Sequence, residues 1–280
     1  SNDLVARLAG DRLRVRWGQP AVVENRAGAS GRIGAEFVSH AAPDGYTFLV
    51  SSPAALVINK SLYAKLSYDS DAFVPVTVIA SGTGVLVVHL GVAANTTREL
   101  IELARSQPGK LTYSSQGNGT IAHLAGELFD ITNNIRTVHV PYKGSAPAVA
   151  DLVAGQVNFL FSELATALPL IQAGKLRALA VGATRRHPLL PSVPLMADTN
   201  ADFYFSYWTA MVAPAGTPLA IARRVSSEIA EGLKQPEMAK RFAEASLEPV
   251  GSSPEDTATY FKAEGERWGN VIRKTGLKGE

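Results

Sequence analysis

The 280-residue sequence contains no cysteine, which excludes disulfides, thiolate metal sites and cysteine nucleophiles. It has little net charge, because 27 lysines and arginines nearly balance 25 aspartates and glutamates. This balance argues against a nucleic acid or an anionic membrane surface as a partner. The sequence also lacks any apolar run near the roughly 20 residues that a membrane-spanning helix needs. What remains is the composition of an ordinary globular protein, 46% hydrophobic and 19% charged.

Several motifs of catalysis and cofactor binding are missing as well. The five histidines show no spacing suited to zinc. Gly28, Gly31 and Gly34 match neither a dinucleotide fingerprint nor a phosphate-binding loop. Ser30 is not followed by the second glycine of a nucleophile elbow, since Arg32 stands there. We therefore expect no catalytic residues, no metal and no cofactor.

The strongest pattern in the sequence is an alternation of strand-like and helix-like segments between residues 111 and 181. Repeated β-α units of this size predict parallel strands with helices on the faces of the sheet. Ligands in such sheets bind at the carboxyl ends of the strands. Outside this region we expect strands at 21–25, 46–50, 74–79, 85–92 and 203–213, and helices at 4–13, 96–106, 219–234, 236–245 and 254–275.

Residues 111–127 carry the clearest candidate binding site. We expect a short strand at 111–114, a glycine-rich loop at 115–119 and a helix that begins near Thr120. Such a junction places small hydroxyl groups beside the free N–H groups and the positive dipole of a helix start, which suit a carboxylate or a phosphate. The alternative is an ordinary strand-to-helix turn in which Thr120 is the N-cap.

Three polar segments follow strands of the β-α series, at 114–115, 143–145 and 162–163. All three are expected at the carboxyl edge of one sheet, where one cleft would collect them. A carboxylate of Glu163 in that cleft would repel a second carboxylate of a ligand and favour an amino or hydroxyl group. The alternative is that Glu163 faces water.

Two more features have two interpretations each. His123 and Glu127 lie one helical turn apart, either as a base with its orienting carboxylate or as a surface contact. Trp208 is either a core residue or a wall of the cleft. The local pattern does not decide between these interpretations.

Several segments, taken together and in order, resemble one known family. They lie at 23–28, 31–36, 42–47, 114–127, 139–145, 173–180 and 213–218, and they include Pro-Asp-Gly-Tyr-Thr at 43–47 and His-Val-Pro-Tyr-Lys-Gly-Ser at 139–145. The family is that of the Bug, or tripartite tricarboxylate transporter (TctC-like), solute-binding receptors. The resemblance runs along nearly the whole chain, and the order of the motifs is more specific than any one of them.

The resemblance implies an α/β fold of the two-lobed periplasmic binding protein type II, or Venus flytrap, with mixed, largely parallel sheets in each lobe. Lobe 1 is expected at 1–103 and 214–280, lobe 2 at 104–213, and the ligand cleft between the lobes. Such a receptor is not an enzyme. It captures a small carboxylate (a dicarboxylate, an amino acid or an aromatic acid) in the periplasm and delivers it to membrane permease subunits. We expect a monomer.

The same resemblance implies a carboxylate held between two loops. One loop precedes the first helix, where members commonly read Gly-Gly-x-x-Asp. Asp3 matches that pattern, but the glycines and a first strand are missing, so we expect a signal peptide and a first strand upstream. The expected ligand-binding residues are Asn2, Asp3, Ser51, Ser114, Ser115, Gly119, Thr120, His123, Ser162, Glu163, Trp208 and Thr209.

Two other classes of function remain in view. The first is a ligand-sensing receptor on the same fold that contacts a periplasmic signalling partner instead of a permease. The second is a small-acid hydrolase or lyase, for which turnover of a bound acid would have to disappear in His123→Ala. A ligand recovered chemically intact would instead indicate a receptor.

Overall fold

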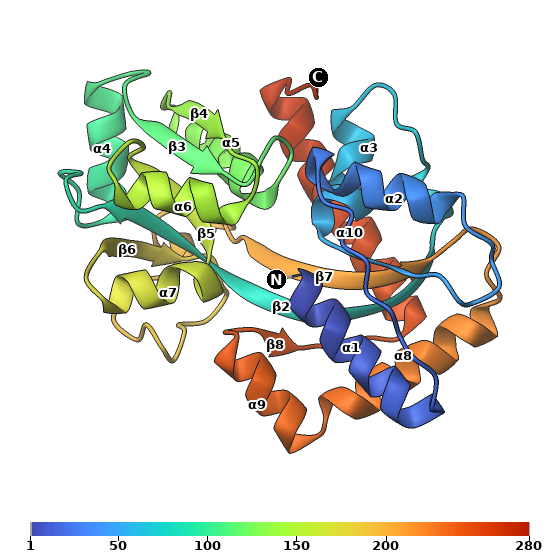
Figure 1. Cartoon of the computed structure of the whole chain (residues 1–280). Helices are drawn as coiled ribbons and strands as arrows, with labels where there is room; N and C mark the ends of the chain where they lie inside the picture. Colours follow the sequence, from blue (N-terminus) through green and yellow to red (C-terminus); the bar gives the residue numbers. More distant parts are fainter. Residues whose placement is uncertain (1, 280) are drawn as a thin grey trace. The chain divides into compact units, whose positions relative to one another are not determined.

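The computed structural model describes residues 2–279. The chain divides into two compact units (Figure 1). Unit 1 comprises Ser1–Ser81, Trp208–Ile272 and Leu277–Glu280, and unit 2 comprises Gly82–Tyr207 and Arg273–Gly276. Residues 1 and 280, the outer limits expected for lobe 1, lie outside the described part. The lobe boundaries expected near residues 103 and 213 stay a prediction.

Unit 1 combines a small sheet with most of the helices at the two ends of the chain. Its helices are α1 (Asn2–Trp17), α2 (Arg32–Ser39), α3 (Asn59–Leu62), α8 (Leu219–Leu233), α9 (Pro236–Glu244) and most of α10 (Pro254–Thr275). Its strands are β1 (Leu49–Ser51), most of β7 (Ser206–Ala213), β8 (Glu248–Pro249) and the first half of β2 (Val74–His89). The strand pairs β1–β7 and β2–β8 are both antiparallel.

The core of unit 1 forms where α1 packs against α8 and the sheet. Val5 and Leu8 of α1 are buried in one cluster with Val225 and Ile229 of α8. The apolar stripe expected at residues 4–13 therefore faces the core, except that Leu4 is exposed. The three C-terminal helices were expected at their observed positions to within about one residue.

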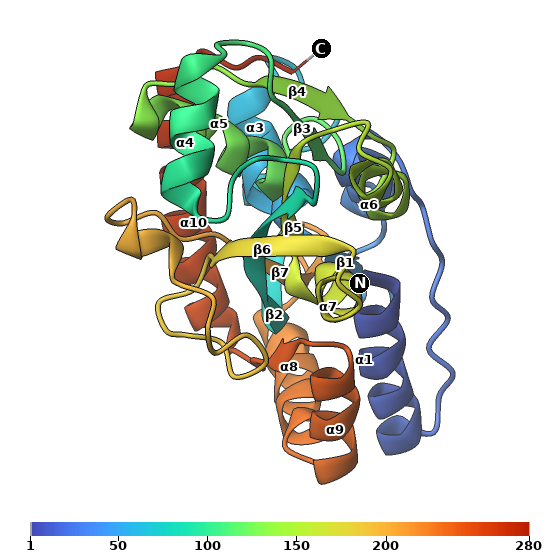
Figure 2. The same cartoon turned by 90° about the vertical axis from the view of Figure 1, so that its left-hand side faces the viewer.

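Unit 2 is a five-stranded sheet with helices on its faces (Figure 2). Its helices are α4 (Thr97–Ser106), α5 (Ile121–Asn133), α6 (Ser145–Val153) and α7 (Leu164–Gln172). Its other strands are β3 (Thr112–Ser115), β4 (Val138–Pro141), β5 (Phe159–Glu163) and β6 (Leu176–Val181). The order is β6-β2-β5-β3-β4, in which β4, β3 and β5 are parallel and β2 is antiparallel to β5 and β6. The predicted α/β class with mixed sheets is confirmed, but the sheets are not largely parallel, because the strand pairs β1–β7, β2–β5, β2–β6 and β2–β8 are antiparallel.

The parallel strands of unit 2 place polar residues at one edge of the sheet. β3 ends at Ser115, β4 at Pro141 and β5 at Glu163, so these carboxyl ends lie along the same edge. Side chains alternate along β3. Ser114 donates to the carbonyl of Ala148 in α6, while Tyr113 on the opposite face contacts α5.

Three of the predicted strands differ from the structure. The strands expected at 74–79 and 85–92 are one continuous strand, β2. Residues 81–84, Ser-Gly-Thr-Gly, resemble a turn, but Gly84 serves close packing, because a Cβ there would collide with the Phe205 ring. Residues 21–25 are extended without a paired strand, and the Val22 side chain is 88% exposed. A β-branched run needs a ladder partner before it becomes a strand.

Phe205 belongs to the aromatic core of unit 2. This core consists of five fully or almost fully buried rings in mutual contact: Phe129, Phe159, Phe161, Phe203 and Phe205. Ring pairs of this kind contribute roughly 0.5–1.5 kcal/mol beyond their buried area. The fit of Phe205 over β2 therefore depends on the missing side chain at Gly84.

We expect Gly84→Ala to lower the free energy of unfolding by roughly 1–3 kcal/mol, because the added methyl group forces the Phe205 ring out of its place. The matched control is Gly265→Ala in α10, where the added Cβ would meet only ordinary contacts of 3.6 Å or more. That change should be neutral or stabilise by up to about 1 kcal/mol. Urea unfolding checks both, and equal stability of the two variants would contradict the packing argument.

Candidate functional site

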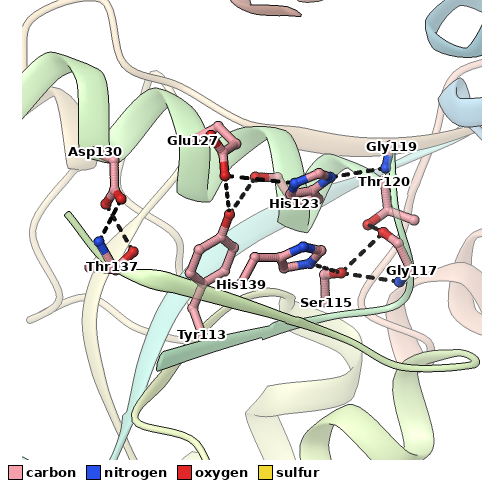
Figure 3. A network of polar contacts seen from close by, with 10 residues as sticks. All are labelled: Tyr113, Ser115, Gly117, Gly119, Thr120, His123, Glu127, Asp130, Thr137 and His139. Carbon is pink, nitrogen blue, oxygen red and sulfur yellow. Dashed lines mark hydrogen bonds and ion pairs between the residues drawn. The ribbon is translucent and has the colours of Figure 1, made fainter. Parts of the chain in front are cut away.

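The loop between β3 and α5 is anchored at both ends by histidines (Figure 3). At its start, Ser115 Oγ accepts the N–H of Gly117 at 3.1 Å and shares a 2.6 Å hydrogen bond with Nε2 of His139. At its end, the N–H of Gly119 donates to Nδ1 of His123 at 3.0 Å. Gly117 and Gly119 have φ angles of 134° and 73°, which only glycine adopts without strain. The loop is therefore held in one conformation.

The two histidine rings stack on each other beneath this loop. Their centroids are 3.8 Å apart and their planes differ by 8°. His123 comes from the first turn of α5 and is 6% exposed, and His139 comes from β4. The parallel pairing of β3 with β4 places Tyr113 opposite His139, and their rings are in contact at 5.0 Å.

Glu127 and Tyr113 complete this network on the far side of His123. Oε1 of Glu127 lies 3.7 Å from Nε2 of His123 and accepts the hydroxyl of Tyr113 at 2.8 Å. Burial alone would raise the pKa of Glu127, but hydrogen bonds from His123 and Tyr113 outweigh it and leave that pKa below its ordinary value. Glu127 is therefore a carboxylate at neutral pH. The i,i+4 pair is part of a buried network, not a surface contact.

The start of α5 leaves donors for a ligand. Thr120 is the N-cap residue, but its side chain accepts no hydrogen bond from the helix. Its hydroxyl donates instead to the carbonyl of Gly117 at 2.8 Å. The first N–H groups of a helix have no acceptor inside the helix, and here the N-cap side chain supplies none either. Together with the helix dipole, these N–H groups suit an anion.

Two groups near the loop have strongly shifted pKa values. Burial, followed by repulsion from His123, lowers the pKa of His139 to about 3, so its ring is neutral at physiological pH. Burial raises the pKa of Asp130 to about 6, although its carboxylate accepts hydrogen bonds from the backbone and hydroxyl of Thr137. Both shifts come from partial exclusion of water around α5 and β4.

Ser115 and His139 are at the contact distance of a nucleophile and its base. A general base works best when its pKa lies near the operating pH, and a pKa of about 3 makes His139 a weak one. The arrangement therefore suits the anchoring of a loop better than the activation of a hydroxyl. Within residues 2–279, no group of three His, Asp or Glu side chains is placed to hold a metal ion.

Three of the expected binding residues in unit 1, Asn2, Asp3 and Thr209, lie near the start of α1. Asn2 accepts the hydroxyl of Thr209 at 2.9 Å. The Asp3 carboxylate accepts hydrogen bonds from Arg7 and from Asn25, which lower its pKa. The structure therefore brings Asn2 and Thr209 together and engages Asp3 with its own neighbours. Their contact with a ligand stays a prediction.

Two further residues of the predicted set are buried in unit 1. Ser51 ends β1 beside Gly31. Trp208 is 2% exposed, and its indole N–H donates to the buried carboxylate of Glu264 at 3.1 Å. These positions are typical of core residues, and the ligand contacts proposed for them stay predictions.

The remaining predicted residues lie at the carboxyl edge of unit 2. Ser115, Gly119, Thr120 and His123 come together around the anchored loop. Ser114 is fully buried against α6, on the opposite face of the strand. Ser162 and Glu163 form the end of β5, one strand away, instead of following it. Ser162 is buried and Glu163 is half-buried.

Sequence reasoning did not assign a site role to Tyr113 or His139. Both act through contacts between distant segments, which no local pattern encodes. His139 belongs to the motif at 139–145, and a parallel pairing of its strand with β3 would have placed it beside Ser115. The expected parallel pairing of these strands was therefore the sequence signal that could have identified His139.

Comparison with known proteins gives a consistent result. The profile of the family described as "Tripartite tricarboxylate transporter family receptor" matches residues 5–277. The chain is 36% identical over 281 residues to the protein BugT of Bordetella pertussis, with 99% of this chain and 86% of BugT covered.

Solved structures agree with this match. The structure of Rpa4515 from R. palustris with adipate has a TM-score of 0.92 and 34% identity, and covers 99% of this chain and 93% of that one. The periplasmic binding protein BugD has a TM-score of 0.89 and 28% identity, with coverage of 100% and 94%. MatC from Rhodopseudomonas palustris with bound malate has a TM-score of 0.87 and 28% identity, with coverage of 97% and 94%.

The lowered pKa of His139 predicts a pH-dependent stability. Between its folded pKa of about 3 and the ordinary value of 6.5, the unfolded chain binds a proton on this ring that the folded chain does not. The free energy of unfolding should therefore fall as the pH drops through this window. In His139→Gln, whose amide can still contact Ser115, the fall should be shallower.

Urea unfolding of both chains at several pH values measures this difference. The raised pKa of Asp130 acts with the opposite sign, since its contribution is lost as the pH rises through about 6. Asp130 is present in both chains, so its effect cancels in the comparison. Parallel pH profiles of the two chains would show that His139 is not a buried neutral group.

Proposed function

Because the chain belongs to the tripartite tricarboxylate transporter receptor family, we propose that it is a periplasmic solute-binding receptor for a small carboxylate. The proposed ligand classes are a dicarboxylate, an amino acid or an aromatic acid. The receptor would deliver its ligand to the membrane permease subunits of a tripartite tricarboxylate-type transporter. Across residues 2–279, none of the helices is both long and apolar enough to cross a bilayer.

One observation supports the carboxylate site most directly. The helix α5 begins without a side-chain cap, because the hydroxyl of Thr120 is engaged with the carbonyl of Gly117. The N–H groups at this helix start are therefore available to the oxygens of a bound anion. The loop before it is already fixed by Ser115 and His123, so binding would cost little ordering entropy.

The ligands of similar proteins agree with this chemistry. Adipate and malate, named with two of the solved structures, are both dicarboxylic acids. A carboxylate at the start of α5 would receive charge-assisted hydrogen bonds, which are roughly twice as strong as neutral ones. The second end of the ligand would then decide which acid is preferred.

A substitution at the N-cap tests the site directly. In Thr120→Asp, the new carboxylate would accept the free N–H groups of α5 and occupy the place of the ligand. We expect the affinity for adipate to fall at least about tenfold, while the thermal midpoint of the ligand-free protein does not fall by more than a few degrees. Isothermal titration calorimetry and thermal unfolding measure the two effects.

The matched control is Thr96→Asp at the start of α4, also in unit 2. Thr96 already caps its helix by accepting the N–H of Glu99 at 3.1 Å, and aspartate is an equally good cap. This control should keep the affinity within about twofold of the unchanged chain. Equal affinity of Thr120→Asp and Thr96→Asp would place the carboxylate away from α5.

Glu163 offers a test of ligand preference. Its position at the carboxyl end of β5 is the basis for the proposal that its negative charge favours an amino or hydroxyl group on the ligand. Glu163→Gln should therefore shift the preference from amino dicarboxylates such as aspartate towards plain ones such as succinate. A calorimetric panel of matched acids checks this, and unchanged relative affinities would rule the role out.

A further inference from the structure

His123 contacts the loop through a ring nitrogen that must accept the hydrogen bond there. Its Nδ1 lies 3.0 Å from the backbone nitrogen of Gly119, and an amide N–H is always the donor. On this contact, and resting on the proposed function above, we propose that His123 is a positioning residue. As a neutral ring with its proton on Nε2, it holds the loop from Ser115 to Gly119 in the conformation that binds the carboxylate.

The surroundings of His123 support this tautomer (Figure 3). Its Nε2 points towards the carboxylate of Glu127, at 3.7 Å, which favours a proton on that nitrogen. The hydroxyl of Tyr113 donates to the same carboxylate oxygen at 2.8 Å and fixes its direction. A chain of contacts therefore runs from Tyr113 through Glu127 and the imidazole to the N–H of Gly119.

A second proton on His123 would disrupt this series of contacts where it reaches the loop. The new N–H on Nδ1 would face the N–H of Gly119, and two donors repel each other. The released glycine would no longer hold the loop against the start of α5. Binding of the carboxylate should therefore weaken when His123 becomes charged.

Three titratable groups face His123, namely Glu127, His139 and Tyr113, and they do not act alike. The Glu127 carboxylate on α5 favours the charged ring, and Asp130, one turn further along α5, lies near Glu127. The ring of His139 from β4 stacks on His123 and opposes a charge there, and Tyr113 from β3 stays protonated because burial raises its pKa. With a pKa of about 3, His139 does not titrate near neutral pH.

Two amide substitutions distinguish the contact made by Nδ1 of the ring from the contact made by Nε2. In His123→Asn, the side-chain oxygen takes the place of Nδ1 and can accept the N–H of Gly119. In His123→Gln, the amide reaches the place of Nε2 and faces Glu127, but leaves Gly119 without its acceptor. Both variants lose the ring stack with His139.

We expect His123→Asn to bind adipate within about threefold of the unchanged chain, and His123→Gln to lose at least about tenfold. Equal losses in both variants, or none in either, would overturn the proposed role.

Two measurements without ligand keep this inference separate from the proposed function. Hydrogen exchange of the Gly119 N–H should be faster in His123→Gln than in His123→Asn, and two-bond ¹H–¹⁵N spectra of the unchanged chain should show the proton of His123 on Nε2. If the unchanged chain binds no carboxylate, the proposed function fails, while these two results still decide the positioning role. A proton on Nδ1 would contradict it.

Discussion

The hydrogen bond from the N–H of Gly119 to Nδ1 of His123 is the constraint on which the candidate site depends. A loop with two glycines at positive φ has many conformations in isolation, and ordering it costs conformational entropy. In the folded unit the loop is already ordered without ligand, because Ser115 and His123 fix its two ends. The site is pre-organised.

The fold supplies the partners for this bond through strand geometry. The parallel pairing of β3 and β4 brings His139 beside Ser115, and alternation along β3 sends Tyr113 to the face that α5 covers. The rings of His123 and His139 stack on each other, and burial keeps a charge off His139. Exclusion of water from this region thus lowers the pKa of His139 and strengthens the hydrogen bonds that hold the loop.

Much of this arrangement could be predicted from the sequence, where the signal was local. The strand-loop-helix at residues 111–127 has a glycine-rich loop between two periodic segments, and it forms within a residue of the expected bounds. The break expected between residues 79 and 85 was wrong, because Gly84 packs against Phe205, over a hundred residues away. Val22 and its neighbours have β-branched character but no partner strand. The contacts of His139 are non-local in the same way.

A crystal structure of the chain with adipate tests the central claim most directly. We expect one carboxylate of adipate within hydrogen-bonding distance of the N–H groups of Ile121 and Ala122 at the start of α5, with Gly119 still bonded to His123. Adipate bound with both carboxylates away from residues 115–123 would contradict it.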